Sequence, residues 1–280
     1  MKKLLLSVFA LVLTVSSFAQ ISTPAASPGA KITQDVGLTE IMVDYSRPAM
    51  KGRTIFAADG LVPFGKIWRT GANGATKITL GQDAKVGGVD LKAGAYAVLT
   101  IPTDKEWTFM MYPYEGSSWN SYTEKEPAAK FMAAPTKTAM PVESFTIGVN
   151  NVTSKSATID FMWENTMVSV PVAVEVHELV MADIKRTMAG PSTNDYYAAA
   201  SYLHDSGTDN AMALEYIQKA TAGDKPGFWM VRREALILAD LGRKQEAIAA
   251  AKRSMTLAKE AGNDDYVRMN EKSIAEWTNK

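Results

Sequence analysis

Residues 60–80, which read GLVPFGKIWRTGANGATKITL, contain the side chains best suited to hold a ligand. Arg69 carries five hydrogen-bond donors in a rigid fork, and Asn73 offers both donors and acceptors. Two nearby glycines would let main-chain N–H groups approach a partner closely. The segment could therefore hold an anionic or polyhydroxyl ligand. Equally, Arg69 could pair with a carboxylate such as Asp44 and fix the chain internally, and the residues alone leave both interpretations open.

A second group of side chains that could bind a ligand is aromatic. Trp119 lies with Tyr114 and Tyr122 in a long connection that lacks regular periodicity, residues 114–141. A connection of this length in a compact domain is unusual enough to mark a candidate site. Its aromatic rings could stack on sugar rings, or they could pack the loop onto the domain beneath it.

The residue types give little support for catalysis. The chain has no cysteine and two histidines, His177 and His204, which fall in different predicted elements. The sequence contains no nucleophile elbow of the G-x-S-x-G type and no phosphate-binding or dinucleotide-binding glycine motif. We therefore predict no catalytic residue, no metal site and no cofactor. A glycosidase-type pair of carboxylates is the alternative, drawn from Asp44, Asp90, Glu106, Asp160 and Glu164.

Residues 1–19 have the pattern of a secretory signal peptide. Lys2 and Lys3 are basic, residues 4–15 are uncharged and apolar, and the small residues Ser17 and Ala19 precede the predicted cleavage point. A membrane-spanning helix needs about 20 apolar residues, so a run this short predicts cleavage after Ala19 rather than a membrane anchor. We expect an exported protein, periplasmic or secreted, with no membrane span after cleavage.

The charge balance argues against polyanionic partners. The chain has 30 basic and 30 acidic residues, so its formal net charge is zero. Proteins that bind nucleic acid or an anionic membrane usually carry a clustered excess of Lys and Arg. We therefore expect no nucleic-acid partner.

Residues 32–174 show the alternation and turn residues of short strands, after a flexible leader at residues 20–31. Two runs each place three large apolar residues on one strand face: Trp107, Phe109 and Met111 in the first, and Ile159, Phe161 and Trp163 in the second. Gly87 and Gly88 predict a tight hairpin, because primed turns need positive φ. A short helix is expected near residues 128–132. Strands without intervening helices predict an antiparallel β-sandwich or a partly open barrel.

From residue 175 the apolar period becomes helical. Ser192 with Asp195 three residues later resembles a capping box at the start of a helix. Further helices are predicted between turn signals that follow one another along the chain: Asp209, Gly223, Pro226, Gly242 and Gly262.

These helices repeat. Residues 213–220 align with residues 247–254 at a shift of 34 residues, which is the tetratricopeptide period. Small Ala235 stands where two helices of a hairpin would meet, but the earlier copy has Ser201 opposite it, and the turn glycine Gly207 is one residue out of register. We predict a tetratricopeptide-like all-α domain over residues 175–280, with a generic bundle of helical hairpins as the alternative.

Several ordered blocks in the first half together resemble one protein family. They are D-Y-S-R-P at 44–48, K-G-R at 51–53, G-L-V-P at 60–63, W-R-T-G-A-N at 68–73 and T-I-P at 100–102. Over residues 32–174 the chain is similar to an exported bacterial domain-of-unknown-function family, numbered twenty-nine eleven. The helical tail resembles an extension that some members carry.

The resemblance implies no established reaction, cofactor or catalytic residue. Gly74 occupies a place where relatives are expected to have Glu. A mechanism that needed a carboxylate at this position would fail in this protein.

Our leading hypothesis is a non-enzymatic exported binding protein. Its β-domain would hold a small ligand or glycan, and its helical tail would dock a protein or peptide, the usual role of such repeats. The candidate ligand-binding residues are Trp68, Arg69, Asn73, Asp44, Arg47 and Trp119. The alternative hypothesis is a cell-envelope glycan hydrolase or lyase that uses carboxylates near the 114–141 loop.

Overall fold

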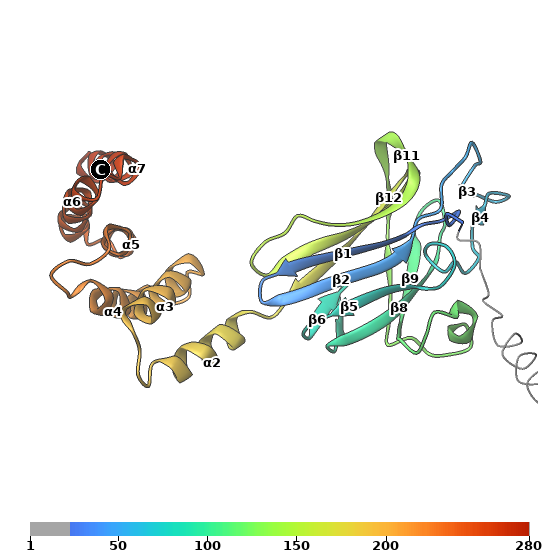
Figure 1. Cartoon of the computed structure of the whole chain (residues 1–280), viewed down its shortest axis with the longest axis horizontal. Helices are drawn as coiled ribbons and strands as arrows, with labels where there is room; N and C mark the ends of the chain where they lie inside the picture. Colours follow the sequence, from blue (N-terminus) through green and yellow to red (C-terminus); the bar gives the residue numbers. More distant parts are fainter. Residues whose placement is uncertain (1–22, 280) are drawn as a thin grey trace, which may run out of the picture. The chain divides into compact units, whose positions relative to one another are not determined.

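The computed structural model describes residues 23–279, which form two compact units that divide after Val176 (Figure 1). The first unit is built from strands and the second from helices, which confirms the predicted β plus α class. The predicted signal peptide, residues 1–19, lies outside the described residues, as do residues 20–22 of the predicted leader. Among residues 23–279, every helix is too short or too polar to cross a membrane.

Six strands of the first unit form one antiparallel sheet in the order β1-β2-β5-β8-β9-β10. Their bounds are β1 Gly29–Val36, β2 Thr39–Ser46, β5 Thr76–Leu80, β8 Gly94–Ile101, β9 Trp107–Pro113 and β10 Ala129–Ala133. Because β1 begins at Gly29, the last three residues of the expected leader belong to the sheet.

A second antiparallel sheet has the order β11-β12-β6-β7. Its strands are β11 Pro135–Asn150, β12 Ser156–Val174, β6 Ala84–Val86 and β7 Val89–Leu91. Gly87 and Gly88 connect β6 to β7 with positive φ, which confirms the predicted tight hairpin. Two short strands, β3 (Phe56–Ala57) and β4 (Val62–Pro63), pair in parallel apart from both sheets.

One hydrophobic core fills the space between the two sheets. The large side chains predicted to share strand faces all lie in it with at most 2% of their surface exposed: Trp107, Phe109 and Met111 from β9, and Ile159, Phe161 and Trp163 from β12. Both predicted faces are therefore confirmed. Burial of this much aromatic and aliphatic surface is the main source of stability available to a chain without cysteine.

The end of β2 and the segment that follows it join the two sheets along one edge. Ala49 forms an antiparallel bridge with Ser144 of β11. The Tyr45 hydroxyl accepts a hydrogen bond from the main-chain N–H of Ile147 at 2.9 Å. Since β11 is an edge strand, these contacts satisfy main-chain groups that would otherwise be unpaired. The unit is thus a β-sandwich joined at one edge, which lies between the two architectures that the sequence left open.

The long connection 114–141 differs from the sequence-based expectation. The helix predicted near residues 128–132 is wrong, because this stretch forms β10 and pairs with β9. Ala129 and Phe131 are buried while Lys130 and Met132 are exposed. The two-residue period of a strand therefore places Ala129 and Phe131 on the same buried face, whereas a helix would point them in different directions. The helical turn lies earlier instead, as the 3-10 helix η1 (Trp119–Tyr122).

A second, smaller core covers the outer face of the six-stranded sheet. Tyr122 is fully buried in it, and its hydroxyl donates to the Gly116 carbonyl at 2.7 Å while accepting from two main-chain N–H groups. The Tyr112 ring lies 5.6 Å from the Tyr122 ring, centre to centre. The aromatic residues of the connection therefore pack this loop onto the sheet.

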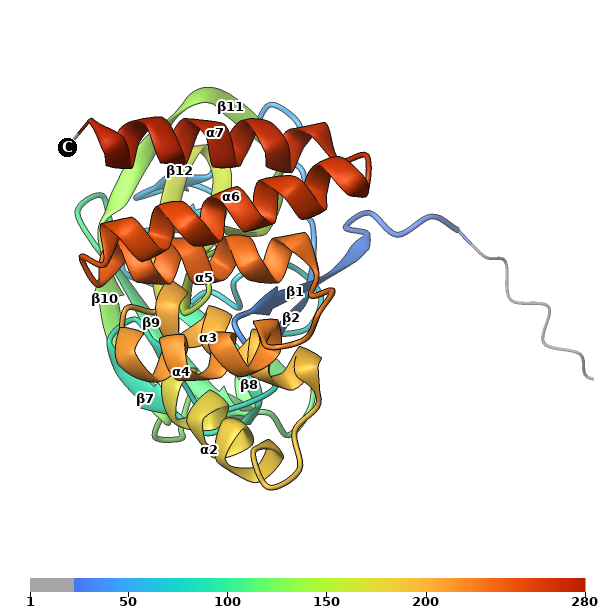
Figure 2. The ribbon, with the colours of Figure 1, turned by 90° about the vertical axis from the view of Figure 1, so that its left-hand side faces the viewer.

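Within residues 177–279 the second unit contains six helices, α2 to α7, and from α3 onward each packs on the next (Figure 2). Their bounds are α2 His177–Thr187, α3 Thr193–Asp205, α4 Asn210–Thr221, α5 Phe228–Asp240, α6 Lys244–Glu260 and α7 Asp264–Thr278. The predicted capping box at Ser192 and Asp195 is confirmed by both of its reciprocal hydrogen bonds. Small apolar residues at the helix contacts, such as Ala213 and Ala247, are fully buried.

The two helical hairpins α3/α4 and α5/α6 repeat with a one-residue difference in their turns. The N–H of Thr208 donates to the Leu203 carbonyl and that of Arg243 to the Leu238 carbonyl, so the ends of the first helices correspond at a shift of 35 residues. The second helices correspond at 34. The residue equivalent to Ala235 is therefore Ala200, also fully buried, rather than Ser201. The turn between α3 and α4 is one residue longer than the turn between α5 and α6, which explains why Gly207 and Gly242 are 35 rather than 34 residues apart.

Candidate ligand-binding site

The loop between Trp68 and Gly74 has an unusual backbone. Thr70 is fully buried and has φ +56°, and Asn73 has φ +59°. Asn adopts this left-handed region readily, but a β-branched residue rarely does. A residue held in such a conformation costs about 1–3 kcal/mol and persists only where its surroundings impose it.

Hydrogen bonds from neighbouring strands hold the loop in this shape. Trp68 and Thr100 exchange two main-chain hydrogen bonds, at 2.7 and 2.8 Å. The hydroxyls of Thr70 and Thr100 lie 3.1 Å apart, and the Thr76 hydroxyl donates to the Thr70 carbonyl. The strained residue is thus fixed by groups on β5 and β8.

Asn73 uses its side chain to hold the protein together. Its amide nitrogen donates to the Ser27 carbonyl and to the Ser46 hydroxyl, both at 3.1 Å. These contacts tie the loop to the chain before β1 and to the end of β2. The side-chain donors of Asn73 are therefore used in hydrogen bonds within the protein rather than directed toward a ligand.

Gly74 follows at a point with no room for a side chain. A Cβ placed there would lie 2.8 Å from Cβ of Ser117, whose carbonyl accepts the N–H of Ala75 at 2.9 Å. Contacts that short do not occur between real Cβ atoms. The connection 114–141 approaches the main chain at this point so closely that residue 74 must be glycine, although relatives were expected to have Glu there.

Arg69 contacts the connection from the other side. Its Nη1 donates to the Asn73 carbonyl at 3.2 Å, and its guanidinium carbon lies 5.5 Å from the ring centre of Trp119, which is a cation–π distance. Pairing with Asp44 does not occur, since the Asp44 carboxylate lies 3.5 Å from the Lys77 ammonium instead. Arg69 has no carboxylate partner among residues 23–279.

Beside this loop lies a cavity of about 330 Å³, which we call the loop-edge cavity. Its walls come from the chain before β1, the turn after β2, β4, the Trp68–Gly74 loop and β12. Three cationic side chains line it, Lys51, Arg53 and Arg69, and no Asp or Glu does. A cavity of this size is large enough for a small molecule.

Two stacked indoles form the inner wall of the loop-edge cavity. The rings of Trp68 and Trp163 lie 5.9 Å apart with an angle of 20° between their planes. Both indole N–H groups donate to main-chain carbonyls, of Gly71 at 3.0 Å and of Glu143 at 3.1 Å. The rings therefore offer a ligand only apolar contact, and the polar contacts must come from the cations.

The remaining predicted residues lie elsewhere. Arg47 donates to the Phe145 carbonyl at 3.1 Å and to the Thr146 hydroxyl at 2.8 Å, which links β2 to β11. Asp44 lines a smaller cavity of about 190 Å³ together with Lys77. The structure thus gathers Trp68, Arg69, Asn73 and Trp119 around one loop, and it places Asp44 and Arg47 away from the cavity.

Of the residues that line the cavity, only Trp68 and Arg69 were among the sequence-based candidates, and the cations Lys51 and Arg53 and the indole of Trp163 were missed. Lys51 and Arg53 stand in one of the blocks that carried the family resemblance, which is the signal that could have found them. Their meeting with Arg69 depends on the joined edge of the sandwich, which no local pattern reveals.

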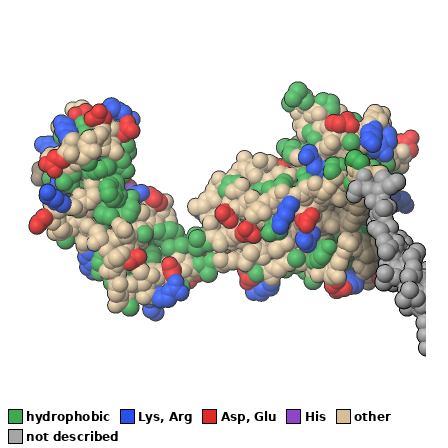
Figure 3. Space-filling view, in the orientation of Figure 1, with side chains coloured by type: hydrophobic (Ala, Val, Ile, Leu, Met, Phe, Trp, Pro, Cys, Tyr) green, Lys and Arg blue, Asp and Glu red, His purple; other side chains and the backbone are tan. Residues whose placement is uncertain are grey.

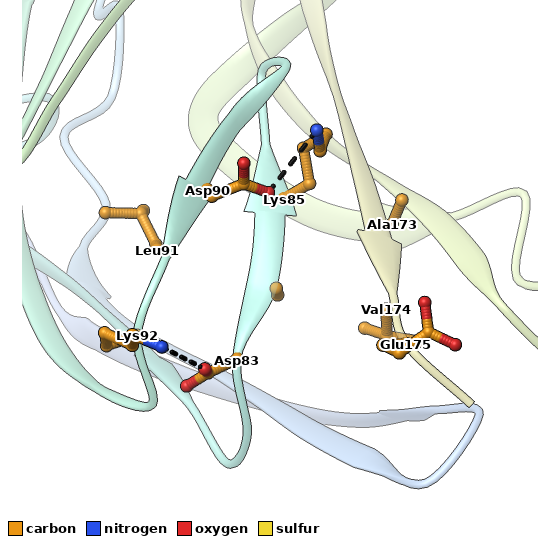
Figure 4. A pocket seen from close by; sticks show the side chains of 9 residues that line it. Asp83, Lys85, Asp90, Leu91, Lys92, Ala173, Val174 and Glu175 are labelled. Carbon is orange, nitrogen blue, oxygen red and sulfur yellow. Dashed lines mark hydrogen bonds and ion pairs between the residues drawn. The ribbon is translucent and has the colours of Figure 1, made fainter. Parts of the chain in front are cut away.

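A second cavity, of about 360 Å³, lies beside the β6–β7 hairpin (Figure 4). Its two cations are paired, Lys92 with Asp83 at 2.8 Å and Lys85 with Asp90 at 3.4 Å. The hydrogen bond from Lys92 lowers the pKa of the Asp83 carboxyl and raises that of the Lys92 ammonium. These are exposed ion pairs of the ordinary surface kind.

Four of the five carboxylates considered for glycoside cleavage have separate partners. Asp160 is 5% exposed and accepts a hydrogen bond from Asn150 at 2.7 Å. Glu164 accepts one from the N–H of Phe56 at 3.5 Å, while Asp44 and Asp90 pair with lysines. Within residues 23–279, no group of three or more His, Asp or Glu is arranged to hold a metal ion.

Comparison with known proteins gives one match. A family model described as "Protein of unknown function (DUF2911)" matches residues 27–172. This range runs from the chain just before β1 almost to the end of β12, and it includes every residue that lines the loop-edge cavity except Ala26. No curated protein matches the chain. No solved structure matches it either.

Proposed function

Because this chain belongs to the family of proteins of unknown function DUF2911, for which no reaction is known, we propose its function from its own sequence and structure. The chain is an exported, non-enzymatic binding protein. Its β-sandwich binds a small ligand in the loop-edge cavity, and its helical unit docks a second protein or peptide. Export rests on the signal-peptide pattern of residues 1–19.

The observation that carries the ligand-binding function is the strained loop at the wall of the cavity. Buried Thr70 at φ +56° is held by hydrogen bonds from two strands, and the residue before it directs a guanidinium to the cavity wall. Strain of this kind tends to gather at functional sites. A purely structural loop between two strands would not need this strain.

Blocking the cavity tests this function. Ala72 lines the cavity, and Ala58 is exposed and lies outside its lining. A panel of small metabolites and glycan oligosaccharides would be screened by thermal shift against the wild-type chain, Ala72→Trp and Ala58→Trp. We expect ligands that raise the melting temperature of wild type and Ala58→Trp but not of Ala72→Trp.

Two results would contradict the proposal. Ligands that stabilise Ala72→Trp as well as wild type would place binding outside the cavity. Conversion of a bound compound into product, followed by mass spectrometry, would show that the protein is an enzyme.

The docking function of the helical unit is supported by its repeat and its surface. The hairpins α3/α4 and α5/α6 correspond at shifts of 35 and 34 residues, which supports a tetratricopeptide-like unit, and the usual binding surface of such repeats is a peptide groove. Hydrophobic side chains lie at the surface of this unit (Figure 3), and Trp229 and Met269 are 40% and 43% exposed. Exposed aromatic residues of this kind often anchor protein interfaces.

Capture from a native envelope extract tests docking. The baits would be the full chain, a chain lacking residues 177–280, Trp229→Ser, and the control Leu179→Ser, which removes a 40% exposed apolar residue from α2 instead. We expect one partner that is lost with the truncation and with Trp229→Ser and kept with Leu179→Ser. Unchanged capture by the truncated chain would contradict a docking role.

A further inference from the structure

We infer that the ligand of the loop-edge cavity is an anion with an aromatic or other apolar body. Lys51, Arg53 and Arg69 hold its charge, and Trp68 and Leu61 contact its body. This inference rests on the proposed function and names the chemical class of ligand for the same site.

The first observation is the sign of the cavity's charge. Its three ionisable lining residues are all cationic, although the whole chain has as many acids as bases. They come from two segments, the turn after β2 and the Trp68–Gly74 loop, that the fold brings to one place. The excess of positive charge is therefore local to the cavity.

The second observation is that these cations have no carboxylate partners. Within residues 23–279 the Lys51 ammonium forms no hydrogen bond or ion pair, and Arg53 donates only to the carbonyls of Met50 and Ala49, at 2.8 and 2.6 Å. Arg69 donates to one carbonyl. The carboxylate of Glu143 near this turn accepts the main-chain N–H of Lys51 at 2.9 Å and does not line the cavity.

The cavity beside the β6–β7 hairpin provides an internal comparison. It has a similar size and also contains two lysines, but each of these lies against an aspartate (Figure 4). In the loop-edge cavity three cations gather instead, with no Asp or Glu in the lining.

A bound anion would supply the carboxylate-like partner that these three cations lack. Hydrogen bonds in which both partners are charged are shorter and about twice as strong as neutral ones. The unused N–H groups of Arg69 and Arg53 and the ammonium of Lys51 could donate to the oxygens of one phosphate, sulfate or carboxylate. A neutral sugar would leave the three cations without a counter-charge.

The apolar side of the cavity indicates what the ligand carries besides its anionic group. Leu61 is 45% exposed and Trp68 is 9% exposed, and both line the cavity. Pro48 and Val62 extend this apolar wall. A bare inorganic anion would contact little of it, so the ligand has a body that covers these side chains.

Calorimetric titration of the full chain tests the inference with three probes: phenyl phosphate, inorganic phosphate and neutral phenyl β-glucoside. We expect phenyl phosphate to bind at one site and tighter than either other probe, with affinity that falls as salt is raised. Lys51→Gln and Arg69→Gln should each weaken its binding about tenfold, as loss of one charge-assisted hydrogen bond would.

Lys92→Gln is the matched control, because it removes the same charge from the other cavity and should leave the affinity unchanged. The exposed Lys51 side chain has no partner among the described residues, so Lys51→Gln should fold normally. The inference is overturned if wild type does not bind phenyl phosphate. It is also overturned if Lys51→Gln and Arg69→Gln bind as tightly as wild type, or if Lys92→Gln weakens binding equally.

The outcomes separate the ligand class from the function. Binding of the neutral glucoside alone, abolished by Ala72→Trp, would show that the cavity binds ligands but that the anionic class is wrong. Phenyl phosphate binding that Ala72→Trp does not affect would show that the cavity is not the site, and both proposals would then fail.

Discussion

At the scale of single residues, the Trp68–Gly74 loop divides into side chains that hold the fold and side chains that face the cavity. Asn73 ties the loop to Ser27 and Ser46, and Gly74 gives the neighbouring connection room to approach. Arg69 instead lines the cavity beside Trp119. Sequence reasoning identified the segment but left both roles open, because the direction of each side chain depends on partners 27 to 46 residues distant.

Substitutions at Asn73 should separate its backbone role from its side-chain role. Asn73→Gly loses two hydrogen bonds, each worth about 0.5–1.5 kcal/mol, but keeps φ +59° without strain. Asn73→Ala also adds the left-handed penalty of about 1 kcal/mol. We expect urea denaturation to rank stability as wild type, then Gly, then Ala. Equal stability of the Gly and Ala variants would contradict the backbone part of this prediction.

Adding a methyl group at Gly74 should destabilise the sandwich. Because a Cβ would lie 2.8 Å from that of Ser117, Gly74→Ala should lower the free energy of unfolding by about 1–3 kcal/mol. Ser117→Gly in the same chain should recover part of the loss. Gly29→Ala is the control, since its nearest neighbour would lie 4.0 Å away. A Gly74→Ala variant as stable as Gly29→Ala would refute the steric explanation.

At the scale of elements, local signals were sufficient where the pairing partner is close in sequence. The β6–β7 hairpin followed from Gly87 and Gly88, and the start of α3 from Ser192 and Asp195. Strand β10 was missed because Ala129 to Ala133 favours a helix when considered alone. Its partner β9 and the Phe131 ring stacked 5.4 Å from Phe109 decide otherwise.

The capping box at α3 should respond to pH in a definite direction. Hydrogen bonds from the hydroxyl and N–H of Ser192 lower the pKa of the Asp195 carboxyl in the folded chain. Their contribution to stability is therefore fully present above the unfolded value of about 3.9. It is lost as pH falls through the lower folded pKa.

Carboxyl-carbon NMR titration measures this effect. Asp195 in the wild type should titrate below an unperturbed aspartate, and Ser192→Ala should move its pKa upward, because the hydroxyl is the largest cause of the shift. The acid-induced loss of α3 helicity should be smaller in Ser192→Ala. An unchanged Asp195 pKa in this variant would argue against the capping explanation.

At the scale of the whole molecule, each unit contains its own core. The core between the sheets draws only on residues up to Val174, with Val176 at its margin, and the helical core begins beyond that point. The β plus α order could be predicted because the apolar period changes near residue 175. The basic cavity could not be predicted from the sequence. The net charge of the chain is zero, and only the joined edge of the sandwich brings the three cations of the cavity together.

Separate cores predict separate folding. Fragments 23–176 and 177–280 should each be monomeric and well dispersed in NMR spectra, and the melting transitions of the full chain should reproduce theirs. A fragment that is molten or aggregated when expressed alone would show that its stability depends on the rest of the chain.

The joined edge of the sandwich also determines how the molecule opens. The N–H of Ile147 on β11 donates to the hydroxyl of Tyr45 on β2, so this hydrogen bond links the two sheets. Solvent deuterium can replace this proton only when the two sheets part. An amide exchanges through the smallest opening that breaks its hydrogen bond. The exchange rate of this one amide therefore measures how often the joined edge beside the cavity opens.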